Sequence, residues 1–157
     1  MSQRLLLMGM MNSRRGVTYL YNEGVENVAW VTGYTAGSAP YNQQSKEATY
    51  FYLQTLGTGV KTYVIDTAID LTSISTIGID WKNTGTAGAY SCLVASTNKV
   101  GSYTLYNARI LLTTGAFSRG VNNLDVSGLS GSHYIRIHAT SNVPVYSKIS
   151  AYKVWLE

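Results

Sequence analysis

The sequence has little of what disulfide-stabilised, nucleic-acid-binding or membrane-spanning proteins require. Cys92 is the one cysteine among 157 residues, so no intramolecular disulfide can form. Charged residues make up 13%, and Arg14-Arg15 is the only basic pair. Nucleic-acid binders usually cluster basic residues with aromatics, so we predict no nucleic-acid partner. The apolar run 5–11 is seven residues long, too short to span a membrane.

Helical patterns are also scarce. From residue 16 onward no window combines an apolar stripe at three- and four-residue spacing with strong helix formers. The chain instead has 15 Gly, 13 Tyr, only 2 Pro and many Thr, Ser and Val, which is the usage of all-β proteins. We predict that residues 17–157 form one antiparallel, jelly-roll-like β-sandwich of about nine or ten strands, preceded by an extension at residues 1–16.

Alternating apolar residues predict which side of each strand faces the core. Phe51 and Leu53 share one face of the strand 49–54, and Ile77, Ile79 and Trp81 share one face of the strand 76–82. Trp81 is therefore a strong core candidate. In the long extended segment 103–113 both faces carry leucine, and the face that includes Ile110 and Leu112 is the expected inner one. Residues 27–34 fit either a short strand or a structured loop, and residues 66–75 either a helical turn or a crossover between sheets.

Turn signals predict how the strands pair. The glycine-containing turn 56–59 predicts a hairpin of strands 49–54 and 60–65. A second hairpin is expected between 134–140 and the closing strand, and this last strand should lie beside an early one. The apolar parity of the last strand switches near Ala151-Tyr152, which predicts a β-bulge there.

Groups able to carry out catalysis are few. The two histidines are His133 and His138, and we expect His138 on the solvent face beside Arg136. No nucleophile motif such as Gly-x-Ser-x-Gly is present, and Cys92 in an apolar run is expected to be a buried, inert thiol. The sequence therefore predicts a protein that is not an enzyme.

Acidic residues leave two alternatives open. Glycosidases use a pair of carboxylates, and the available ones are those of Glu47, Asp66, Asp70, Asp80 and Asp125. A calcium ion held by Asp66, Asp70 and loop carbonyls is the other alternative, although the spacing does not match an EF-hand loop. Otherwise we expect no cofactor and no metal, because Asp66 and Asp70 also fit turn-capping roles.

Tyrosine is the strongest remaining signal, with 13 Tyr against 2 Phe. Such side chains are enriched at interfaces and can stack on sugar rings. The aromatic residues expected on loops or outward faces are the predicted ligand-binding residues: Trp30, Tyr34, Tyr41, Tyr50, Tyr52 and Tyr90. Ordinary surface tyrosine, subunit contact and glycan stacking all remain open as explanations.

Several short segments carry a family resemblance. Residues 19–24 with 31–34, 69–72 with 77–81, and the closing Tyr152-Lys-Val-Trp-Leu-Glu157 resemble the small β-sandwich modules of tail, fibre and minor structural proteins of phages that infect Gram-positive bacteria. The resemblance implies a jelly-roll-like fold, a location in the virion, a homo-oligomer with a trimer favoured, other virion proteins as partners, and binding to cell-surface polysaccharide.

Two functional hypotheses follow, besides the hydrolase. The first is a non-enzymatic virion structural or adhesion module that binds host surface glycan through exposed aromatics. The second is a capsid decoration, head-fibre or neck protein anchored by its N-terminal arm. The apolar residues expected to make that assembly contact are Leu5, Leu6, Leu7, Met8, Met10 and Met11.

Overall fold

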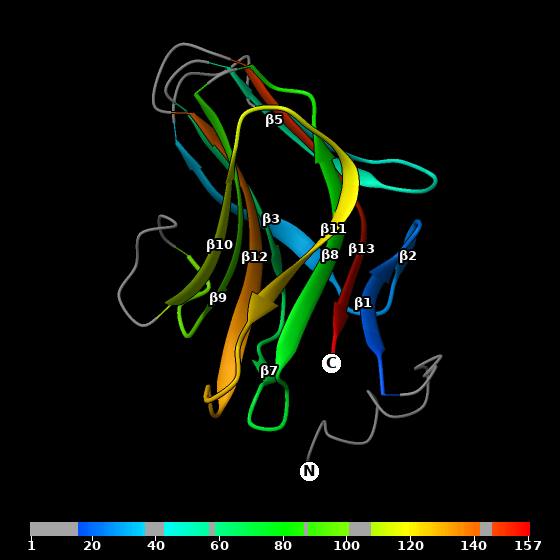
Figure 1. Cartoon of the computed structure of the whole chain (residues 1–157), viewed down its shortest axis with the longest axis vertical. Helices are drawn as coiled ribbons and strands as arrows, with labels where there is room; N and C mark the ends of the chain where they lie inside the picture. Colours follow the sequence, from blue (N-terminus) through cyan, green and yellow to red (C-terminus); the bar gives the residue numbers. More distant parts are fainter. Residues whose placement is uncertain (1–15, 37–42, 57–58, 87, 101–107, 142–145) are drawn as a thin grey trace.

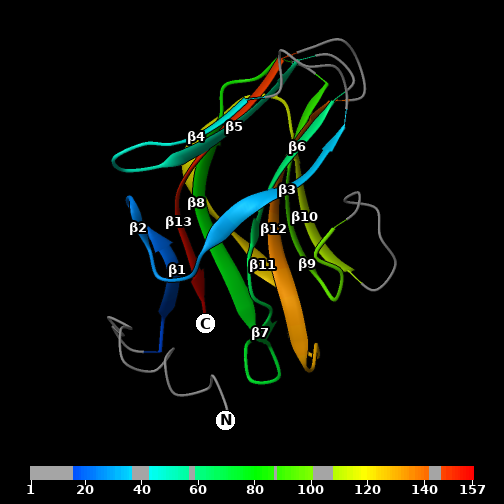
Figure 2. The same cartoon turned by 180° about the vertical axis from the view of Figure 1, so that it is seen from behind.

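The fold consists of strands and the turns that join them. The computed structural model describes residues 16–36, 43–56, 59–86, 88–100, 108–141 and 146–157. Within these ranges, thirteen strands form two antiparallel sheets that face each other (Figures 1 and 2). The predicted all-β sandwich is confirmed. The strand number exceeds the expectation because three of the strands have four residues or fewer. In the described part of the chain no helix could cross a bilayer.

Sheet A contains seven strands. They are β1 (Thr18–Asn22), β2 (Val25–Glu26), β4 (Gln43–Lys46), β5 (Phe51–Leu56), β8 (Thr76–Asn83), β11 (Phe117–Asp125) and β13 (Tyr146–Leu156). The main order is β11-β8-β13-β1-β2, and β5 pairs with both β13 and β4. One edge of β13 therefore pairs with β8, while β5 and β1 share its other edge.

Sheet B contains six strands. They are β3 (Trp30–Ala36), β6 (Val60–Ile65), β7 (Ile69–Asp70), β9 (Ala89–Ser96), β10 (Ala108–Thr114) and β12 (Ser132–Ser141). Their order is β10-β9-β12-β6-β3, with the short β7 paired to the start of β12. Residues 66–75 thus form a crossover that contains β7, and β3 accounts for most of the segment 27–34.

The core lies between the two sheets, as the alternation of apolar residues predicted. Phe51, Leu53, Ile77, Ile79 and Trp81 are all buried. From the other sheet the core receives Tyr63, Ile65, Leu93, Ala95, Ile135, Ile137 and Ala139. The indole Nε1 of Trp81 donates a hydrogen bond of 2.8 Å to Oδ1 of Asn122, so the largest core side chain keeps its polar group satisfied.

The closing strand is the centre of sheet A. Its C-terminal half pairs with β1, which confirms that the last strand lies beside an early one. The register against β8 shifts between Ala151 and Lys153, so the predicted bulge is confirmed as well. The extra residue keeps Ala151 and Val154 both in the core on either side of the bulge.

Both predicted hairpins are wrong. β5 belongs to sheet A and β6 to sheet B, and β12 and β13 are likewise split between the two sheets. In each case the connecting turn carries the chain from one sheet to the other. A short polar connection shows where two strands end. Whether the second strand pairs with the first or joins the other sheet depends on contacts between residues distant in sequence.

The predicted inner face of β10 is also wrong. Ile110 and Leu112 are 37% and 46% exposed, while Leu111 packs against the core. β10 is an edge strand whose register is set by β9, where Leu93 is the residue opposite Leu111. The arm at residues 1–15, with its six predicted assembly residues, lies outside the described residues.

Candidate functional site

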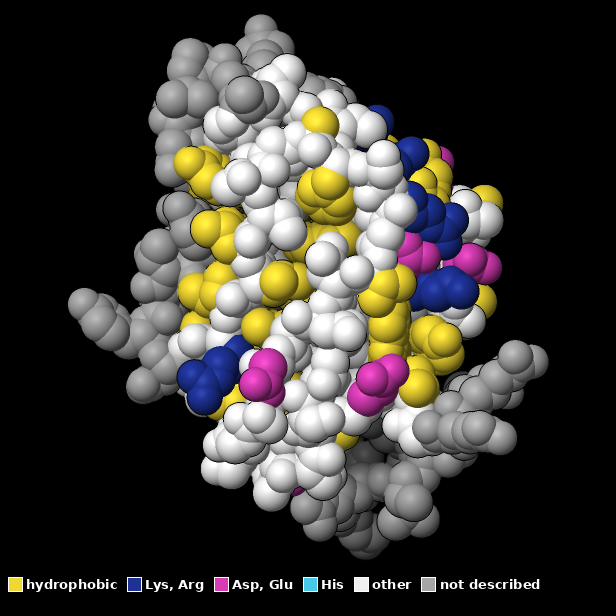
Figure 3. Space-filling view, viewed as in Figure 1, with side chains coloured by type: hydrophobic (Ala, Val, Ile, Leu, Met, Phe, Trp, Pro, Cys, Tyr) yellow, Lys and Arg dark blue, Asp and Glu magenta, His cyan; other side chains and the backbone are white. Residues whose placement is uncertain are grey.

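The outer face of sheet A gathers aromatic and charged side chains. Figure 3 shows Lys, Arg, Asp and Glu side chains along the right-hand edge, where the strands of sheet A lie in this view. Ser150 in β13 stands between Tyr52 of β5 and Lys82 of β8 in one row across the sheet. These residues point outward because their neighbours in sequence, Leu53 and Trp81, point into the core.

The bulge in β13 places two successive side chains on this face. Tyr152 and Lys153 both lie opposite Asp80 of β8, since the bulge adds one residue to β13 at this point. The Tyr152 ring lies 5.3 Å from the ring of Tyr50, and the ammonium of Lys153 is 3.4 Å from Oε1 of Glu23. A regular strand would have turned one of the two side chains into the core.

Trp155 lies flat on the sheet because β8 has a glycine beneath it. Gly78 is its partner across the strands, and a methyl group on Gly78 would come within 2.1 Å of Cε2 of the indole. The other neighbour across the sheet is Tyr19, whose ring centre is 6.2 Å from that of Trp155. Glu157 Oε1 accepts a hydrogen bond of 2.9 Å from the indole Nε1, which fixes the orientation of the ring.

Arg119 is held in place by an acid and an aromatic ring. Its Nε and Nη2 donate to the carboxylate of Asp80, with Nη2 2.7 Å from Oδ2, and its guanidinium carbon lies 3.8 Å from the centre of the Tyr152 ring. The hydrogen bonds to Asp80 raise the pKa of Arg119 above the ordinary value of an arginine. The register of β11 shifts between Phe117 and Gly120, so a second irregularity directs this side chain.

A strained turn brings the second acid to the same place. Asn22 pairs with Val25, and the two residues between them, Glu23 and Gly24, have φ of 46° and 95°. Positive φ at both positions is characteristic of a type I′ hairpin turn, and it is unfavourable for glutamate. The Glu23 amide donates to the carbonyl of Tyr152 at 2.8 Å, and its carboxylate lies between Arg119 and Lys153.

We call this surface the aromatic platform. Its half-buried rings are Tyr19, Tyr50, Tyr52 and Trp155, and Tyr152 lies beneath Arg119 at its centre, 9% exposed. Rings held flat on a sheet beside fixed hydrogen-bonding groups can bind a flat, polar ligand by stacking and hydrogen bonding.

Comparison with known proteins identifies the fold. No protein-family model and no curated protein match the sequence. Solved structures do match. A family 11 carbohydrate-binding module from a cellulosomal cellulase of Clostridium thermocellum has a TM-score of 0.57 and 18% identity, covering 92% of this chain and 95% of its own.

The same family 11 module, in complex with a β-1,3-1,4-mixed-linked tetrasaccharide, gives a TM-score of 0.58 with 18% identity and covers 92% of this chain and 96% of that one. A family 29 carbohydrate-binding module complexed with mannohexaose gives 0.58 with 12% identity and covers 92% of each chain. This chain has their fold. Variants of the family 29 module with alanine in place of an aspartate, a lysine or an arginine were made to probe its ligand recognition.

The structure distributes the six predicted ligand-binding residues unevenly. It brings Tyr50 and Tyr52 together on the aromatic platform. Tyr90 is half-buried on β9 in the other sheet. The side chain of Tyr34 and the whole of Tyr41 lie outside the described part of the chain.

Trp30 was expected to be an outward residue, and this is wrong. The ring is 3% exposed and its centre lies 5.4 Å from that of Phe51 in the core. Trp30 begins β3 inside the segment 27–34, which fitted either a short strand or a structured loop, so its sequence neighbours gave no clear alternation. Its partner across the sheet is the buried Ile65, which fixes the ring on the inner side.

The sequence reasoning did not select Tyr19, Tyr152 or Trp155 as site residues. One available signal was the switch in the alternation of apolar residues along the last strand. It predicted the bulge, but not that the bulge places Tyr152 on the outer face. Gly78 inside an otherwise regular strand was a second available signal, because such a glycine often marks a close approach of another group.

The expected solvent position of His138 is wrong. It shares the outer face of sheet B with Arg136, yet both side chains are 0% exposed. Nδ1 lies 2.9 Å from Oγ1 of Thr62, and burial, with a smaller contribution from the charge of Arg136, lowers the pKa of His138 to about 3. Cys92, opposite His138, is buried as predicted, and burial raises the pKa of its thiol to about 12.

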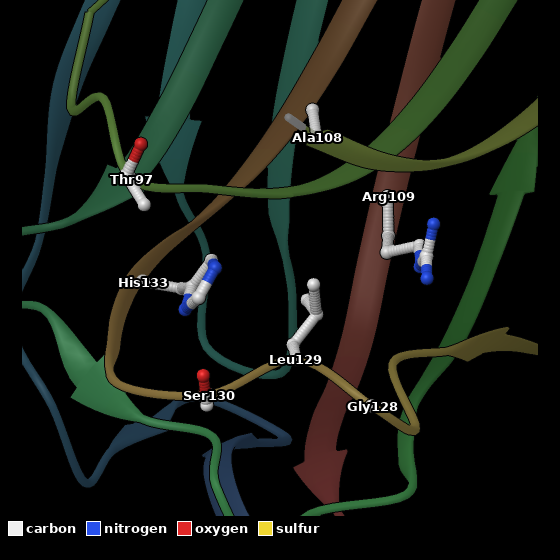
Figure 4. A pocket seen from close by; sticks show the side chains of 7 residues that line it. All are labelled: Thr97, Ala108, Arg109, Gly128, Leu129, Ser130 and His133. Atoms are coloured by element: carbon white, nitrogen blue, oxygen red, sulfur yellow. The ribbon is translucent and has the colours of Figure 1, made fainter. Parts of the chain in front are cut away.

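A pocket of about 470 Å³ lies at one end of sheet B (Figure 4). Its lining residues are Thr97, Ala108, Arg109, Gly128, Leu129, Ser130 and His133. Leu129 lies between Arg109 and His133, and Nδ1 of His133 is 3.0 Å from the carbonyl of Gly131. Among the described residues that line it there is no carboxylate, so this lining lacks the paired carboxylates that a glycosidase uses.

Four of the five carboxylates considered for hydrolysis or calcium binding have separate partners. Asp66 pairs with Lys99 at 2.6 Å, Asp80 pairs with Arg119, and Asp125 accepts a bond of 2.6 Å from the hydroxyl of Ser127. Asp70 likewise accepts a bond from Thr72. Within the described ranges no group of three His, Cys, Asp or Glu residues could hold a metal ion.

Proposed function

We propose that this chain is a non-enzymatic carbohydrate-binding module that binds a polysaccharide on the aromatic platform. The observation that carries the proposal is Trp155, held flat over Gly78 with its ring contacting Tyr19. An indole in this position offers one face to a sugar ring. Because the ring is already ordered in the free protein, binding loses little side-chain conformational entropy.

The groups around the rings support the same conclusion. Arg119 is fixed by Asp80 and Tyr152, so its guanidinium is positioned before a ligand binds. Three irregular features of the backbone, the bulges in β13 and β11 and the turn at Glu23, converge here. Such features often accompany functional sites because they redirect side chains. The residue types replaced in the family 29 variants also surround this platform.

The proposal is tested by titrating soluble polysaccharides into the protein by calorimetry. We expect Trp155→Ala and Tyr52→Ala each to weaken binding about tenfold or more, since a central stacked aromatic residue contributes at least about 1.4–2 kcal/mol. Tyr90→Ala is the matched control, because Tyr90 is equally half-buried but lies on the other sheet. If Tyr90→Ala abolishes binding and Trp155→Ala does not, the site is on sheet B.

We also propose the biological setting implied by the sequence resemblance: a structural or adhesion component of a phage virion, working as a homo-oligomer beside other virion proteins. The alternative of a decoration, head-fibre or neck protein anchored by residues 5–11 makes a different prediction. Deletion of residues 1–15 should then abolish incorporation into virions while circular dichroism shows an intact β domain; normal incorporation would exclude the anchoring role.

A further inference from the structure

We infer that the aromatic platform takes an anionic polysaccharide, one whose sugar units carry carboxylate or phosphate groups. The inference rests on the proposed function and specifies its ligand class. Four cationic side chains border the rings, namely Arg119, Lys82, Lys148 and Lys153, against the three carboxylates of Asp80, Glu23 and Glu157. The platform therefore has a net positive charge.

The three carboxylates already have partners, and that of Glu157 accepts the hydrogen bond from the indole of Trp155. Both Asp80 oxygens accept hydrogen bonds from Arg119, and the Asp80 side chain is only 12% exposed. The carboxylate of Glu23 is shared between Arg119 and Lys153, 3.4 Å from each. These acids neutralise and position the cations at the centre of the platform, so a ligand carboxylate would not meet a free negative charge there.

The other two cations have no such partner. Among the described residues neither Lys82 nor Lys148 pairs with a carboxylate. Each lies close to a ring instead: the Lys148 ammonium is 4.4 Å from the centre of the Tyr52 ring, and that of Lys82 is 5.9 Å from the centre of Tyr152. A sugar stacked on Tyr52 would bring its acidic substituent within reach of these ammonium groups.

The cations follow the closing strand. From Lys148 to Lys153 the strand extends roughly 15 Å, at about 3.3 Å per residue. Charges distributed over this length match a polymer with repeated negative groups better than a single small anion. A single-stranded nucleic acid has a similar charge pattern; because the inference rests on the proposed glycan binding, nucleic acid enters below as an outcome of the test.

The experiment compares matched ligands by affinity electrophoresis and calorimetry. The panel contains polygalacturonate, its carboxyl-reduced neutral form, a phosphorylated mannan, neutral mixed-linkage β-glucan and single-stranded DNA. We expect at least one of the two anionic glycans to bind about tenfold or more tightly than the neutral glycans, and the binding to weaken when salt shortens the range of charge interactions to roughly 3 Å at 1 M. Which anionic glycan binds distinguishes carboxylate from phosphate.

Two double variants separate charge at the site from overall charge. Lys82→Gln with Lys148→Gln should lower affinity for the anionic glycan about tenfold or more, whereas Lys99→Gln with Arg109→Gln, which removes the same charge from sheet B and the loop beside it, should not. Circular dichroism and thermal unfolding check that both fold.

The outcomes are distinguishable. Equal or tighter binding of a neutral glycan, still abolished by Trp155→Ala, overturns the inference and leaves the proposed function standing. Preference for DNA over every glycan overturns both, and so does binding of no ligand in the panel by the folded wild-type protein.

Discussion

At the residue scale, His138 shows how burial controls the charge state of a side chain. The imidazole is fully buried next to Arg136, and its Nδ1 forms a hydrogen bond with Thr62. Because desolvation and the neighbouring positive charge both disfavour the imidazolium form, the folded protein keeps His138 neutral far below the usual pKa of histidine. Protonation therefore favours the unfolded chain.

This predicts an acid-sensitive stability. The pKa of His138 is about 3 in the folded state, below the 6.5 of an exposed histidine, so the unfolded chain binds more protons between these values. The free energy of unfolding should fall as pH falls from about 6.5 towards 3, by up to about 1.4 kcal/mol per pH unit from this residue. Urea unfolding at several pH values measures it.

His138→Asn is the control for the carboxylates, which titrate in the same range. Asparagine has no titrating group and retains an atom that can bond to Thr62, so the variant should show a shallower slope than the wild type between pH 6 and 4. Identical slopes for the two proteins would show that His138 is not the source.

A second prediction at this scale concerns Gly78. Gly78→Ala puts a methyl group into the Trp155 ring, so we expect a loss of about 1–3 kcal/mol in the free energy of unfolding, a displaced indole and weaker glycan binding. Gly120→Ala is the matched control on the adjacent strand, where the nearest atom to an added methyl group is 3.9 Å away. Tryptophan fluorescence and calorimetry follow both. Equal, small effects of the two substitutions would contradict the close packing of Trp155 on β8.

At the scale of elements, irregular positions of the strands carry the candidate site. The regular stretches of β8 and β13 bury Ile79, Trp81 and Ile149, and the bulge and the turn next to them direct Tyr152 and Glu23 outward. A strand that only alternates supplies one outward residue for each inward residue. A bulge supplies two in succession, which is why the platform is densest where the pairing of β13 is interrupted.

The β1–β2 turn allows a prediction about the backbone strain at Glu23. Glutamate at φ 46° is disfavoured by about 1 kcal/mol, and asparagine tolerates this region better. The exposed ion pairs of Glu23 contribute less than this. Glu23→Asn should therefore raise the free energy of unfolding by about 0.5–1 kcal/mol.

The same substitution removes a carboxylate from the platform, so it should also strengthen binding of an anionic glycan. Glu26→Gln is the control, because Glu26 lies just past the same turn and pairs with Lys46 rather than with a platform residue. A Glu23→Asn protein less stable than the wild type would show that the ion pairs outweigh the backbone strain.

At the scale of the whole molecule, Cys92 reports on global unfolding. The thiol is 0% exposed in the central part of sheet B, and burial raises its pKa to about 12. At neutral pH a thiol reagent should not modify the folded protein and should react once per chain in denaturant. The rate at intermediate urea concentrations should follow the global transition measured by circular dichroism. Fast labelling under native conditions would contradict the burial of β9.

Much of the strand pattern was predictable, and so was the pairing of the last strand with β1, but the two expected hairpins were wrong. Phe51, Leu53 and Trp81 face the core as their alternation indicated, since burial of one face needs only local periodicity. The segments around β6 and β12 were placed in hairpins because their turns are short, while in the structure these turns cross between sheets. Of the candidate site, Tyr50 and Tyr52 were predicted, and Trp30 was wrongly included.

The sequence alone determined an all-β chain, the inward residues of most strands, the bulge near Tyr152 and the burial of Cys92. These follow from composition and from interactions between residues close in sequence. Only the tertiary structure decided which strands are neighbours, and hence that Tyr19, Arg119 and Trp155 meet on one face. Tyr19 lies 100 positions before Arg119 and 136 before Trp155 in the sequence. Their approach depends on the summed packing of both sheets, which no local pattern records.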